Sequence, residues 1–551
     1  MKVYEALAQA FTEEGTSDVF AMMGGGNRQW LNAMARRGAR LHSVRHEGAG
    51  LGMADGFARV TGRPGVVSTT SGPGITQLST TLVVASRAGT PLVAYCGEVV
   101  LGDESDVQWF DSQRYAAAVE CEFVRLLKPE AAYEAARRAF YTARTQSRPV
   151  ILSAPEDVQQ LDVDECPGYQ ASLRVIDDLR LPPAGERIQR AAGLIADSAR
   201  VVIVAGRGAL EAGAGDLILR LQRQTGALLA TTLPAKNWLS DQADFYAGTS
   251  GKFATRAATE LLREADCVIG VGASLNRYTT RDGSLYPGAR YIQIDRRPPY
   301  LLGSGRLADC YIQADLTLAL RELAQAVEGA PARPAGYHTP GTRELLAGAL
   351  ADPEVFELEP GVVDPRDACR VIDEELPSQV RLVLSAGYYA GFGMMLFTRA
   401  RDHILVNYGN FGAVGEGVML AIGAVVGNGL RPTALVEGDA GFMMYLGEFE
   451  TACREGLPLL VIVMNDQALG AENHYSAAEG LDPELTFIPT PDLGRVAASL
   501  GGTGALVTNL DELRAALRAF VARPAPTVID LRISRDVLTI PDRRERLAMN
   551  V

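Results

Sequence analysis

The chain has 551 residues, too many for a single hydrophobic core, and this length corresponds to about three domains. Its net charge of −13 argues against nucleic acid and anionic membrane surfaces as partners, because both would repel it. The seven cysteines stand singly, without metal-ligand spacing, which favours a reducing, cytoplasmic compartment. The longest apolar runs, VMLAIGAVV and LPLLVIVM, are much shorter than the roughly 20 residues of a membrane-spanning helix.

Residues 1–160 alternate helix-like and strand-like segments. The start, MKVYEALAQAFTEEG, has the pattern of an amphipathic helix and lacks that of a signal peptide. LHSVRH, GVVSTTS and PLVAYCGE have the composition of strands, and helices are expected after Glu47 and Gly74. A polar stretch with Pro and Asp, residues 156–183, is typical of a linker. These features predict a parallel sheet covered by helices.

Two further regions repeat this alternation. Residues 186–328 contain ARVVIVAGRGAL, ADCVIGVGAS and ARYIQID as expected strands, and a Pro- and Gly-rich stretch at 328–341 indicates a second linker. Residues 361–535 form the third region, and residues 536–551 remain as a C-terminal tail. The sequence therefore predicts an α/β protein with three doubly wound parallel-sheet domains, of which the first and third are alike.

The third region contains VEGDAGF and VIVMNDQALGAENH, in which two apolar runs each end in a polar pair. Asp439 and Asp466 are separated by about the length of one strand–helix–strand unit. They are thus expected at carboxyl ends of neighbouring parallel strands, where α/β sheets bind ligands. With the backbone carbonyl of Ala468, they offer the oxygen ligands that Mg²⁺ takes beside a diphosphate. Two ordinary strand-end turns would give the same spacing, so spacing alone leaves both interpretations open.

These segments resemble the cofactor motif of the thiamine diphosphate (ThDP) enzymes of the acetolactate synthase and benzaldehyde lyase type. That motif begins Gly-Asp-Gly and ends Asn-Asn over the same interval, whereas this chain has GDA at 438–440 and ND at 465–466. Alanine is a small change in a tight turn, and Asp466 keeps an oxygen ligand while adding a charge. The resemblance implies that Asp439, Asp466 and Ala468 hold Mg²⁺, which in turn binds the cofactor's diphosphate.

The first region carries an independent match. VRHEGAGLGMADGFARVTGRPGVVSTTSGPG resembles the family's pyrimidine-binding segment, in which a Glu contacts the N1′ nitrogen of the aminopyrimidine; that position is Glu47 here. A carboxyl group at N1′ promotes the imino tautomer, whose 4′ nitrogen removes the thiazolium C2 proton to give a nucleophilic ylid. A Glu at a helix start is also typical of capping. However, TSGPG at 70–74 and RPVILSAPED at 148–157 match the family as well.

Three other positions are compared with the family. In NYGNFGAVGEGVMLAIGA, Val414 matches the apolar side chain that lies under the cofactor; a core valine is the alternative. Gly206 and Gly208 lack the third glycine of a Rossmann fingerprint, and the family's middle domain binds FAD in some members and nothing in others. Lys236 matches a lysine at the active-site mouth of acetolactate synthases, and a solvated surface lysine is the alternative.

The acid–base groups of some relatives are missing here. The loop GDESDVQWFDSQRY lacks the His pair of pyruvate decarboxylases, and Gly26 stands where benzaldehyde lyase has a His. Gln108 matches the loop Gln of acetolactate synthase. Glu472 follows Asn465 at the offset of the catalytic Glu of pyruvate decarboxylases, and burial beside the cofactor is expected to raise its pKa. A helix-capping Glu472, with His474 as the acid–base group, is the alternative.

The resemblance covers nearly the whole chain. It implies a ThDP- and Mg²⁺-dependent lyase or carboligase that acts, through the ylid and an enamine, on a 2-oxo acid or 2-hydroxy ketone. The alternatives are an FAD-dependent enzyme of the pyruvate oxidase kind, a simple 2-oxo acid decarboxylase and, remotely, a non-catalytic scaffold. In the family the cofactor lies between two subunits, which implies a homodimer or homotetramer with active sites at the subunit interface. The C-terminal tail is expected to fold over the site.

The resemblance also implies a set of site residues. The catalytic residues are Glu47, Gln108, Glu472 and His474; the cofactor-binding residues are Glu47, Gly72, Pro73, Gly412, Val414, Gly438, Asp439, Ala440, Gly441, Asp466, Leu469 and Gly470; and the metal ligands are Asp439, Asp466 and Ala468.

Overall fold

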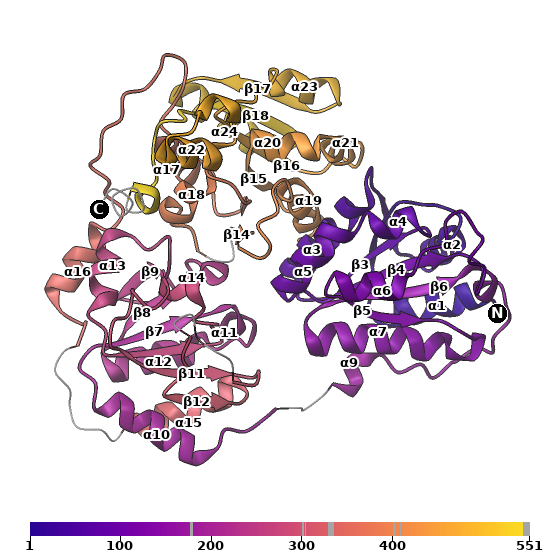
Figure 1. The fold of residues 1–551 in the computed structure, drawn as a ribbon, viewed down its shortest axis with the longest axis horizontal. Helices are drawn as coiled ribbons and strands as arrows, with labels where there is room; N and C mark the ends of the chain where they lie inside the picture. Colours follow the sequence, from indigo (N-terminus) through magenta and orange to yellow (C-terminus); the bar gives the residue numbers. More distant parts are fainter. Residues whose placement is uncertain are drawn as a thin grey trace. The chain divides into compact units, whose positions relative to one another are not determined.

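The computed structural model describes residues 1–176, 180–299, 302, 305–328, 336–400, 404–407 and 409–543. In that part of the chain the strands form three six-stranded sheets, one in each predicted region (Figure 1). The chain divides into two compact units. The first unit comprises residues 1–178, 379–388 and 407–533, and the second comprises residues 179–378, 389–406 and 534–551.

The first sheet is parallel, with strand order β2-β1-β3-β4-β6-β5. The strands predicted at 41–46, 65–71 and 91–98 correspond to β2, β3 and β4, whereas β1 had no clear signal in the sequence. The strands are β1 (Asp18–Ala21), β2 (Arg40–Ser43), β3 (Gly65–Thr69), β4 (Leu92–Glu98), β5 (Glu122–Arg125) and β6 (Pro149–Pro155). The helices are α1 (Val3–Glu13), α2 (Arg28–Arg36), α3 (Glu47–Thr61), α4 (Pro73–Thr76), α5 (Ser79–Ala88), α6 (Ser112–Ala118), α7 (Ala132–Gln146), α8 (Glu156–Gln159) and α9 (Ser172–Val175).

The second sheet is also parallel and has the order β12-β11-β10-β7-β8-β9, the arrangement of a Rossmann-like sheet. Its strands are β7 (Val201–Ala205), β8 (Leu228–Thr231), β9 (Tyr246–Thr249), β10 (Cys267–Val271), β11 (Arg290–Asp295) and β12 (Cys310–Gln313). The helices are α10 (Gly185–Ala196), α11 (Arg207–Glu211), α12 (Gly215–Thr225), α13 (Arg256–Arg263), α14 (Arg277–Thr280), α15 (Leu316–Glu328) and α16 (Pro340–Ala347).

The third sheet has the order β14-β13-β15-β16-β18-β17, which repeats that of the first sheet. Its strands are β13 (Arg381–Leu384), β14 (Ile404–Val406), β15 (Thr433–Gly438), β16 (Leu459–Asn465), β17 (Thr503–Val507) and β18 (Thr527–Arg532). The helices are α17 (Pro365–Glu375), α18 (Ala390–Leu396), α19 (Gly417–Gly427), α20 (Asp439–Met444), α21 (Leu446–Arg454), α22 (Gly470–Glu479), α23 (Leu493–Ser499) and α24 (Leu510–Ala522).

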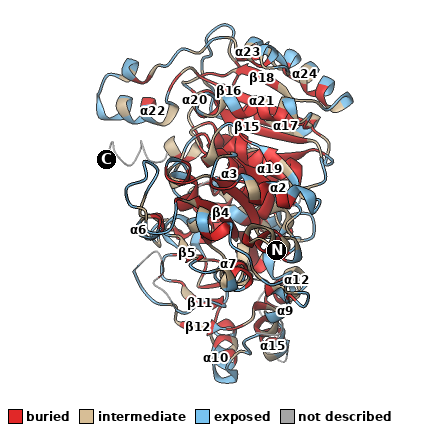
Figure 2. Cartoon of the chain, turned by 90° about the vertical axis from the view of Figure 1, so that its right-hand side faces the viewer, coloured by how far each residue is buried: buried red, intermediate tan, exposed pale blue. Residues whose placement is uncertain are grey.

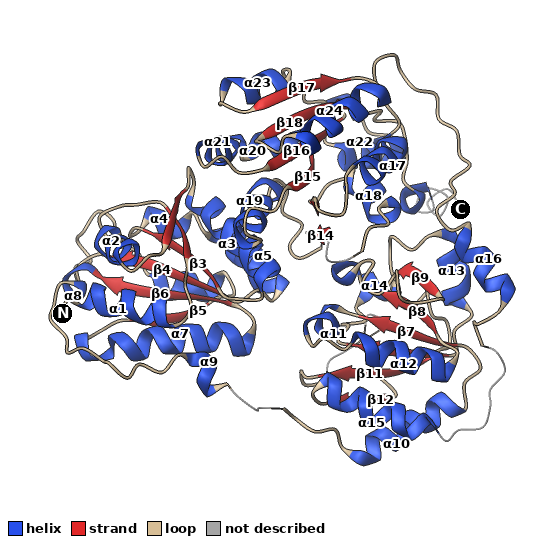
Figure 3. Ribbon diagram, turned by 180° about the vertical axis from the view of Figure 1, so that it is seen from behind, coloured by secondary structure: helices blue, strands red, loops and turns tan. Residues whose placement is uncertain are grey.

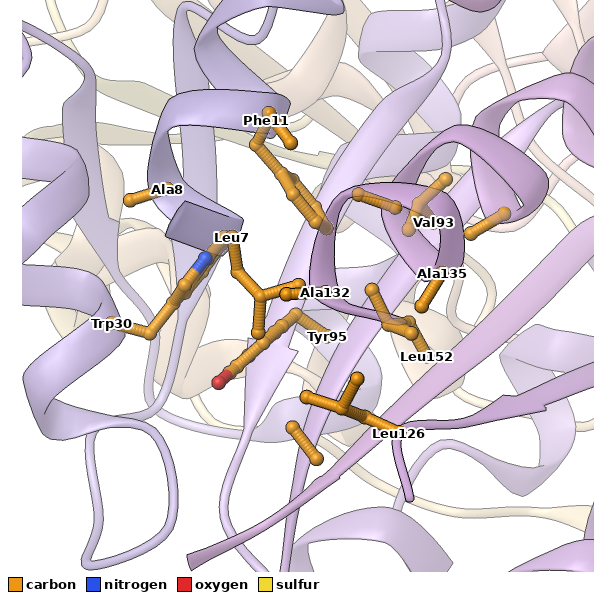
Figure 4. Packing of buried hydrophobic residues seen from close by; sticks show 14 of the residues in the cluster. Leu7, Ala8, Phe11, Trp30, Val93, Tyr95, Leu126, Ala132, Ala135 and Leu152 are labelled. Atoms are coloured by element: carbon orange, nitrogen blue, oxygen red, sulfur yellow. The ribbon is translucent and has the colours of Figure 1, made fainter. Parts of the chain in front are cut away.

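Helices cover the faces of each sheet, as expected for strands with almost no exposed side chains (Figure 3). Figure 4 shows one of the resulting cores, on the side of the first sheet covered by α1, α2 and α7. There Trp30 stacks on Tyr95 at a centroid distance of 4.1 Å, and Phe11 meets the edge of Trp30 at 5.0 Å. The prediction of a doubly wound α/β protein is therefore confirmed.

Helices α3 and α19 pack together inside the first unit, and both are almost wholly buried (Figure 2). Their backbones approach so closely that glycine is required. A Cβ atom on Gly56 would lie 2.1 Å from the carbonyl oxygen of Leu420, and one on Gly423 would lie 1.9 Å from that of Met53. This contact joins the first region to the third within one chain.

The predicted linkers and the tail are only partly described. The first linker contains the short helices α8 and α9, and half of the second, residues 329–335, lies outside the described residues. The tail belongs to the second unit as far as residue 543, where Arg543 pairs with Asp352 at 2.6 Å. Residues 544–551 lie outside the described part, so the tail's role as a lid stays a prediction.

Among the described residues, no helix has both the length and the apolar character needed to cross a bilayer.

The α3–α19 contact generates the first prediction. We expect Gly423→Ala to lower the free energy of unfolding by about 1–3 kcal/mol, because a methyl group would overlap the Met53 carbonyl. Gly193→Ala is the matched control, since Gly193 lies within α10 and its added Cβ would meet no atom within 4 Å. That control should be neutral, or stabilising by up to about 1 kcal/mol. Urea titrations measure both, and equal effects would contradict the close contact.

Candidate active site

Asp439 and Asp466 lie at carboxyl ends of neighbouring parallel strands, as expected. Strand β15 ends at Gly438 and pairs with β16, which ends at Asn465. Asp439 begins α20, and Asp466 follows β16 directly. Both side chains are buried, with exposed fractions of 3% and 8%. The strand topology thus brings the two predicted metal ligands to one edge of the sheet.

The turn after β16 has a conformation set by its own residues. The Asp466 Oδ1 atom accepts a hydrogen bond of 3.0 Å from the backbone N–H of Ala468. Gln467 has a φ of +56°, in the left-handed region that non-glycine residues seldom adopt. A Cβ atom on Gly470, the first residue of α22, would lie 2.7 Å from Asp466 Oδ2, so a larger residue there would displace the Asp466 carboxylate.

The turn that contains Gly412 and Val414 lies against the same edge. A Cβ atom on Gly415 would come within 3.1 Å of the Gly441 carbonyl oxygen. The carboxylate of Glu437 accepts hydrogen bonds of 3.1 Å from the backbone N–H groups of both Gly417 and Gly438. The cofactor-binding residues predicted at 412–414 and 438–441 are therefore neighbours.

The electrostatics of this edge suit a cation. Burial raises the pKa of Asp439 to about 6, although two backbone N–H groups oppose the shift. A buried carboxylate of this kind gains stability from a nearby positive charge. The described residues contain no group of three or more His, Cys, Asp or Glu side chains arranged to hold a metal. The donors at hand are two carboxylates and a backbone carbonyl, which fit Mg²⁺ when a diphosphate supplies further oxygens.

Glu47 is the first residue of α3 and is half-buried. A Cβ atom on Gly74 would lie 3.5 Å from Glu47 Oε1, so the carboxyl group borders the TSGPG turn. Gly72 has a φ of +51°, and its Cβ would lie 2.4 Å from the carbonyl oxygen of Gln108. The structure thus brings Glu47, Gly72, Pro73 and the loop of Gln108 together, with the Gln108 side chain exposed.

The same turn holds polar atoms that suit a polar ligand. Among the described residues, the buried hydroxyl groups of Thr69 and Ser71 have no hydrogen-bond partner. A bound aminopyrimidine offers donors and acceptors to such groups. Gly26 lies against this turn, where a Cβ would be 2.8 Å from Ser71 Oγ and 2.9 Å from the Cα of Gly97. A histidine at position 26 would not fit without backbone movement.

Exposure tests one alternative that the sequence left open, a core valine at position 414. Val414 is not a core valine, because 43% of its surface is exposed. Glu472 lies in the first turn of α22 and is exposed in the chain alone, so its burial beside the cofactor stays a prediction. His474 is buried instead, and its ring centroid lies 4.2 Å from that of Tyr388. Leu469 is 40% exposed beside them.

In the second unit, the alternative of a solvated Lys236 is wrong. Lys236 is only 4% exposed, and burial lowers its pKa to about 8, although Asp373 opposes the shift. Gly206 and Gly208 have a packing role, since a Cβ on either would lie within 3.1 Å of the Gly272 backbone. The Rossmann-like glycine pair is thus explained without a bound nucleotide.

Three buried glutamates near the site, Glu416, Glu437 and Glu448, had no sequence prediction. Glu416 precedes α19, and among the described residues its Oε1 atom has no hydrogen-bond partner. Burial raises its pKa to about 8. Glu448 lies in α21 and is 1% exposed. The sequence signal that could have identified Glu416 and Glu448 is an acidic residue beside apolar residues of a predicted helix, in EGVMLAIGA and YLGEFETA.

Three family models match the chain in order. Thiamine pyrophosphate enzyme, N-terminal TPP binding domain, matches residues 1–118; the central domain of the same enzymes matches residues 188–323; and their C-terminal TPP binding domain matches residues 385–531. Thiamine pyrophosphate is another name for ThDP. The chain therefore belongs to the thiamine pyrophosphate enzymes, which confirms the resemblance found in its sequence.

The chain is similar over its length to acetolactate synthases. It is 28% identical to the probable acetolactate synthase large subunit of Methanocaldococcus jannaschii, over 96% of this chain and 92% of that protein. It is 26% identical to acetolactate synthase 2, chloroplastic, of Nicotiana tabacum, over 98% and 83%. This chain is thus a ThDP-dependent enzyme of the acetolactate synthase superfamily, which carries out carboligation or decarboxylation.

Proposed function

We propose that this enzyme is an Mg²⁺-dependent, acetolactate synthase-like carboligase that acts on a 2-oxo acid or 2-hydroxy ketone. The observation that supports the proposal is that one compact unit contains both groups of predicted site residues. One half is Glu47 beside the TSGPG turn, and the other is Asp439 and Asp466 at one sheet edge. The similarity to acetolactate synthases along the whole chain supports the carboligase reaction.

Each half has a proposed chemical role. When bound, ThDP supplies a carbon nucleophile that adds to carbonyl groups. The carboxyl group of Glu47 exchanges a proton with the pyrimidine, and its place beside the TSGPG turn orients that ring. Asp439, Asp466 and the Ala468 carbonyl hold Mg²⁺ against the diphosphate. The exposed side chain of Val414 supports the underside of the cofactor.

The remaining predicted residues complete the site. Glu472 holds and delivers the proton that the reacting carbonyl carbon or oxygen requires, and His474 is the alternative for this role. Gln108 contacts the substrate from the loop over the TSGPG turn. The backbone around the cofactor comes from the other predicted positions: Gly72, Pro73, Gly412, Gly438, Ala440, Gly441, Leu469 and Gly470.

The experiment that tests the reaction uses a panel of substrates. The protein with ThDP and Mg²⁺ is incubated with 2-oxo acids and 2-hydroxy ketones, while CO₂ and ketone products are followed. Acetolactate formation from pyruvate supports the proposal. Release of aldehyde alone would identify a simple decarboxylase, and a flavin absorption band with oxygen uptake would identify the oxidase.

The proposal extends to organisation and compartment. The domain boundaries are proposed at 1–160, 186–328 and 361–535, with 536–551 as the tail. All seven cysteines are free thiols, which supports a reducing, cytoplasmic location. The proposed assembly is a homodimer or homotetramer. Helices α3 and α19 contact each other within one chain. If two copies exchanged their first regions, α3 of each copy would pack against α19 of the other, and the same contact would then join the two subunits.

The metal site gives a prediction for two substitutions. We expect Asp439→Ala to weaken ThDP binding about tenfold or more at low Mg²⁺, with recovery as Mg²⁺ is raised, because the cation links the diphosphate to the protein. Asp466→Asn restores the residue typical of the family and should change affinity little. Calorimetric titration with and without chelator measures both. Asp511→Ala, at an exposed position of α24, is the control. Wild-type affinity of Asp439→Ala in chelator would contradict the site.

The acid–base role gives a second prediction. With saturating ThDP, Glu472→Gln should lower kcat about 100-fold, because the proton donor to the reacting carbonyl is lost. CO₂ from a single turnover should still form. Glu479→Gln, at the exposed end of the same helix, is the matched control. Unchanged turnover in Glu472→Gln, together with a collapse in His474→Ala, would transfer the role to the histidine.

The proposed subunit exchange predicts complementation. At low Mg²⁺, where Glu47→Gln and Asp439→Ala chains each have little activity alone, coexpression should restore about one quarter of wild-type activity, since a mixed dimer contains one intact pair of halves. If each site forms within a single chain, every site in the mixture carries one lesion. Absence of recovery in purified mixed dimers would therefore place the site within one subunit.

A further inference from the structure

Glu448 connects the third region to the segment that leads into Glu47. Its Oε1 atom accepts two hydrogen bonds of 2.9 Å, from the backbone N–H groups of Arg45 and His46. Its Oε2 atom accepts a hydrogen bond of 2.8 Å from the hydroxyl group of Thr451 in the same helix. Both carboxylate oxygens of this buried side chain are thus occupied by donors.

Burial of the Glu448 carboxylate costs free energy of solvation, which its hydrogen bonds offset. Burial raises the pKa of Glu448, and the Thr451 hydroxyl and the two N–H groups oppose that shift. Arg45 and His46 lie between the end of β2 and the start of α3, where neither a strand nor a helix supplies their acceptors. Buried backbone N–H groups left without acceptors cost free energy. One carboxylate oxygen serves both donors, and this fixes two successive peptide groups.

This anchor acts one residue away from Glu47. His46 is the N-cap residue of α3, and its Nδ1 atom accepts a hydrogen bond of 3.0 Å from the N–H of Gly48. Its ring meets Tyr445, at the start of α21, edge to face at 5.9 Å. Adjacent Cα atoms are about 3.8 Å apart, so the position of His46 restricts where Glu47 can lie.

We propose that Glu448 is a positioning residue for Glu47: by holding the peptide groups of Arg45 and His46, it fixes the carboxyl group of Glu47 at the pyrimidine of the cofactor. This inference rests on the proposed function of Glu47. It predicts that α21 of the third region sets the geometry of a catalytic group carried by the first region. Glu450 lies two residues further on and pairs with the exposed guanidinium group of Arg45 at 2.7 Å, so it contacts the same segment without holding its backbone.

The experiment compares Glu448→Ala, Glu448→Gln and Glu450→Gln in the full chain. Glutamine keeps an oxygen acceptor for both N–H groups, and Glu450→Gln is the matched control for a lost ion pair. Hydrogen exchange of the Arg45 and His46 amides is measured without cofactor, by mass spectrometry of peptides that cover 40–50. Exchange of the C2 proton of ThDP is then measured at saturating ThDP and Mg²⁺.

We expect Glu448→Ala to speed exchange of these amides and to slow C2 proton exchange about tenfold or more, with ThDP still bound. Glu448→Gln and Glu450→Gln should stay near wild type. If Glu448→Ala does not fold, Glu448→Asp provides the same test, because it withdraws the carboxylate by roughly 1.5 Å.

Two results would overturn the assignment: C2 exchange at the wild-type rate in Glu448→Ala, or equal defects in the alanine and glutamine variants. Glu47→Gln is measured in parallel. If Glu47→Gln itself exchanged at the wild-type rate, the proposed function of Glu47 would fail, together with the inference built on it. Slow exchange in Glu47→Gln with normal exchange in Glu448→Ala would remove only the role of Glu448.

Discussion

The close contact between α3 and α19 is the constraint on which the rest of the site depends. Because Gly56 and Gly423 have no side chains, the backbone of each helix touches the other directly, and the two helices have little freedom to slide. Helix α3 begins with Glu47, and α19 follows the turn that contains Val414. One helix pair thus restricts the distance between the two groups of residues that we propose as the pyrimidine half and the diphosphate half of the site.

A network of buried charges is a second link between the first and third regions. His42 donates hydrogen bonds to the carboxylates of Asp18 and Glu455, at 3.0 and 2.6 Å. Burial disfavours a charge on His42, but these two carboxylates outweigh it and raise the pKa of His42 to about 9. At neutral pH a protonated imidazole therefore links β2 to the end of α21. Such networks tolerate burial only when each charge has its partner, which restricts how the two regions can pack.

The sequence predicted the three α/β domains and the enzyme family better than the surroundings of single side chains. Strand-end residues such as Asp439 and Asp466 follow from apolar runs and the spacing of parallel strands, which are local properties. The burial of Lys236, the exposure of Glu472 and the anchor at Glu448 depend on which distant segments pack there, and no local pattern reports that. Glycines were informative only in part: Gly206 and Gly208 form an incomplete nucleotide-binding fingerprint, and the structure shows that both allow a close backbone approach to Gly272.

The central claim is that Glu47, held at the start of α3, activates the cofactor bound at the Asp439–Asp466 edge. Protium–deuterium exchange at C2 of bound ThDP, followed by quenched flow and NMR, tests it most directly. Glu47→Gln keeps the shape of the side chain but removes its acidic proton. The account predicts that ThDP still binds while exchange slows about 100-fold or more. Exchange at the wild-type rate, with ThDP bound, would contradict the account.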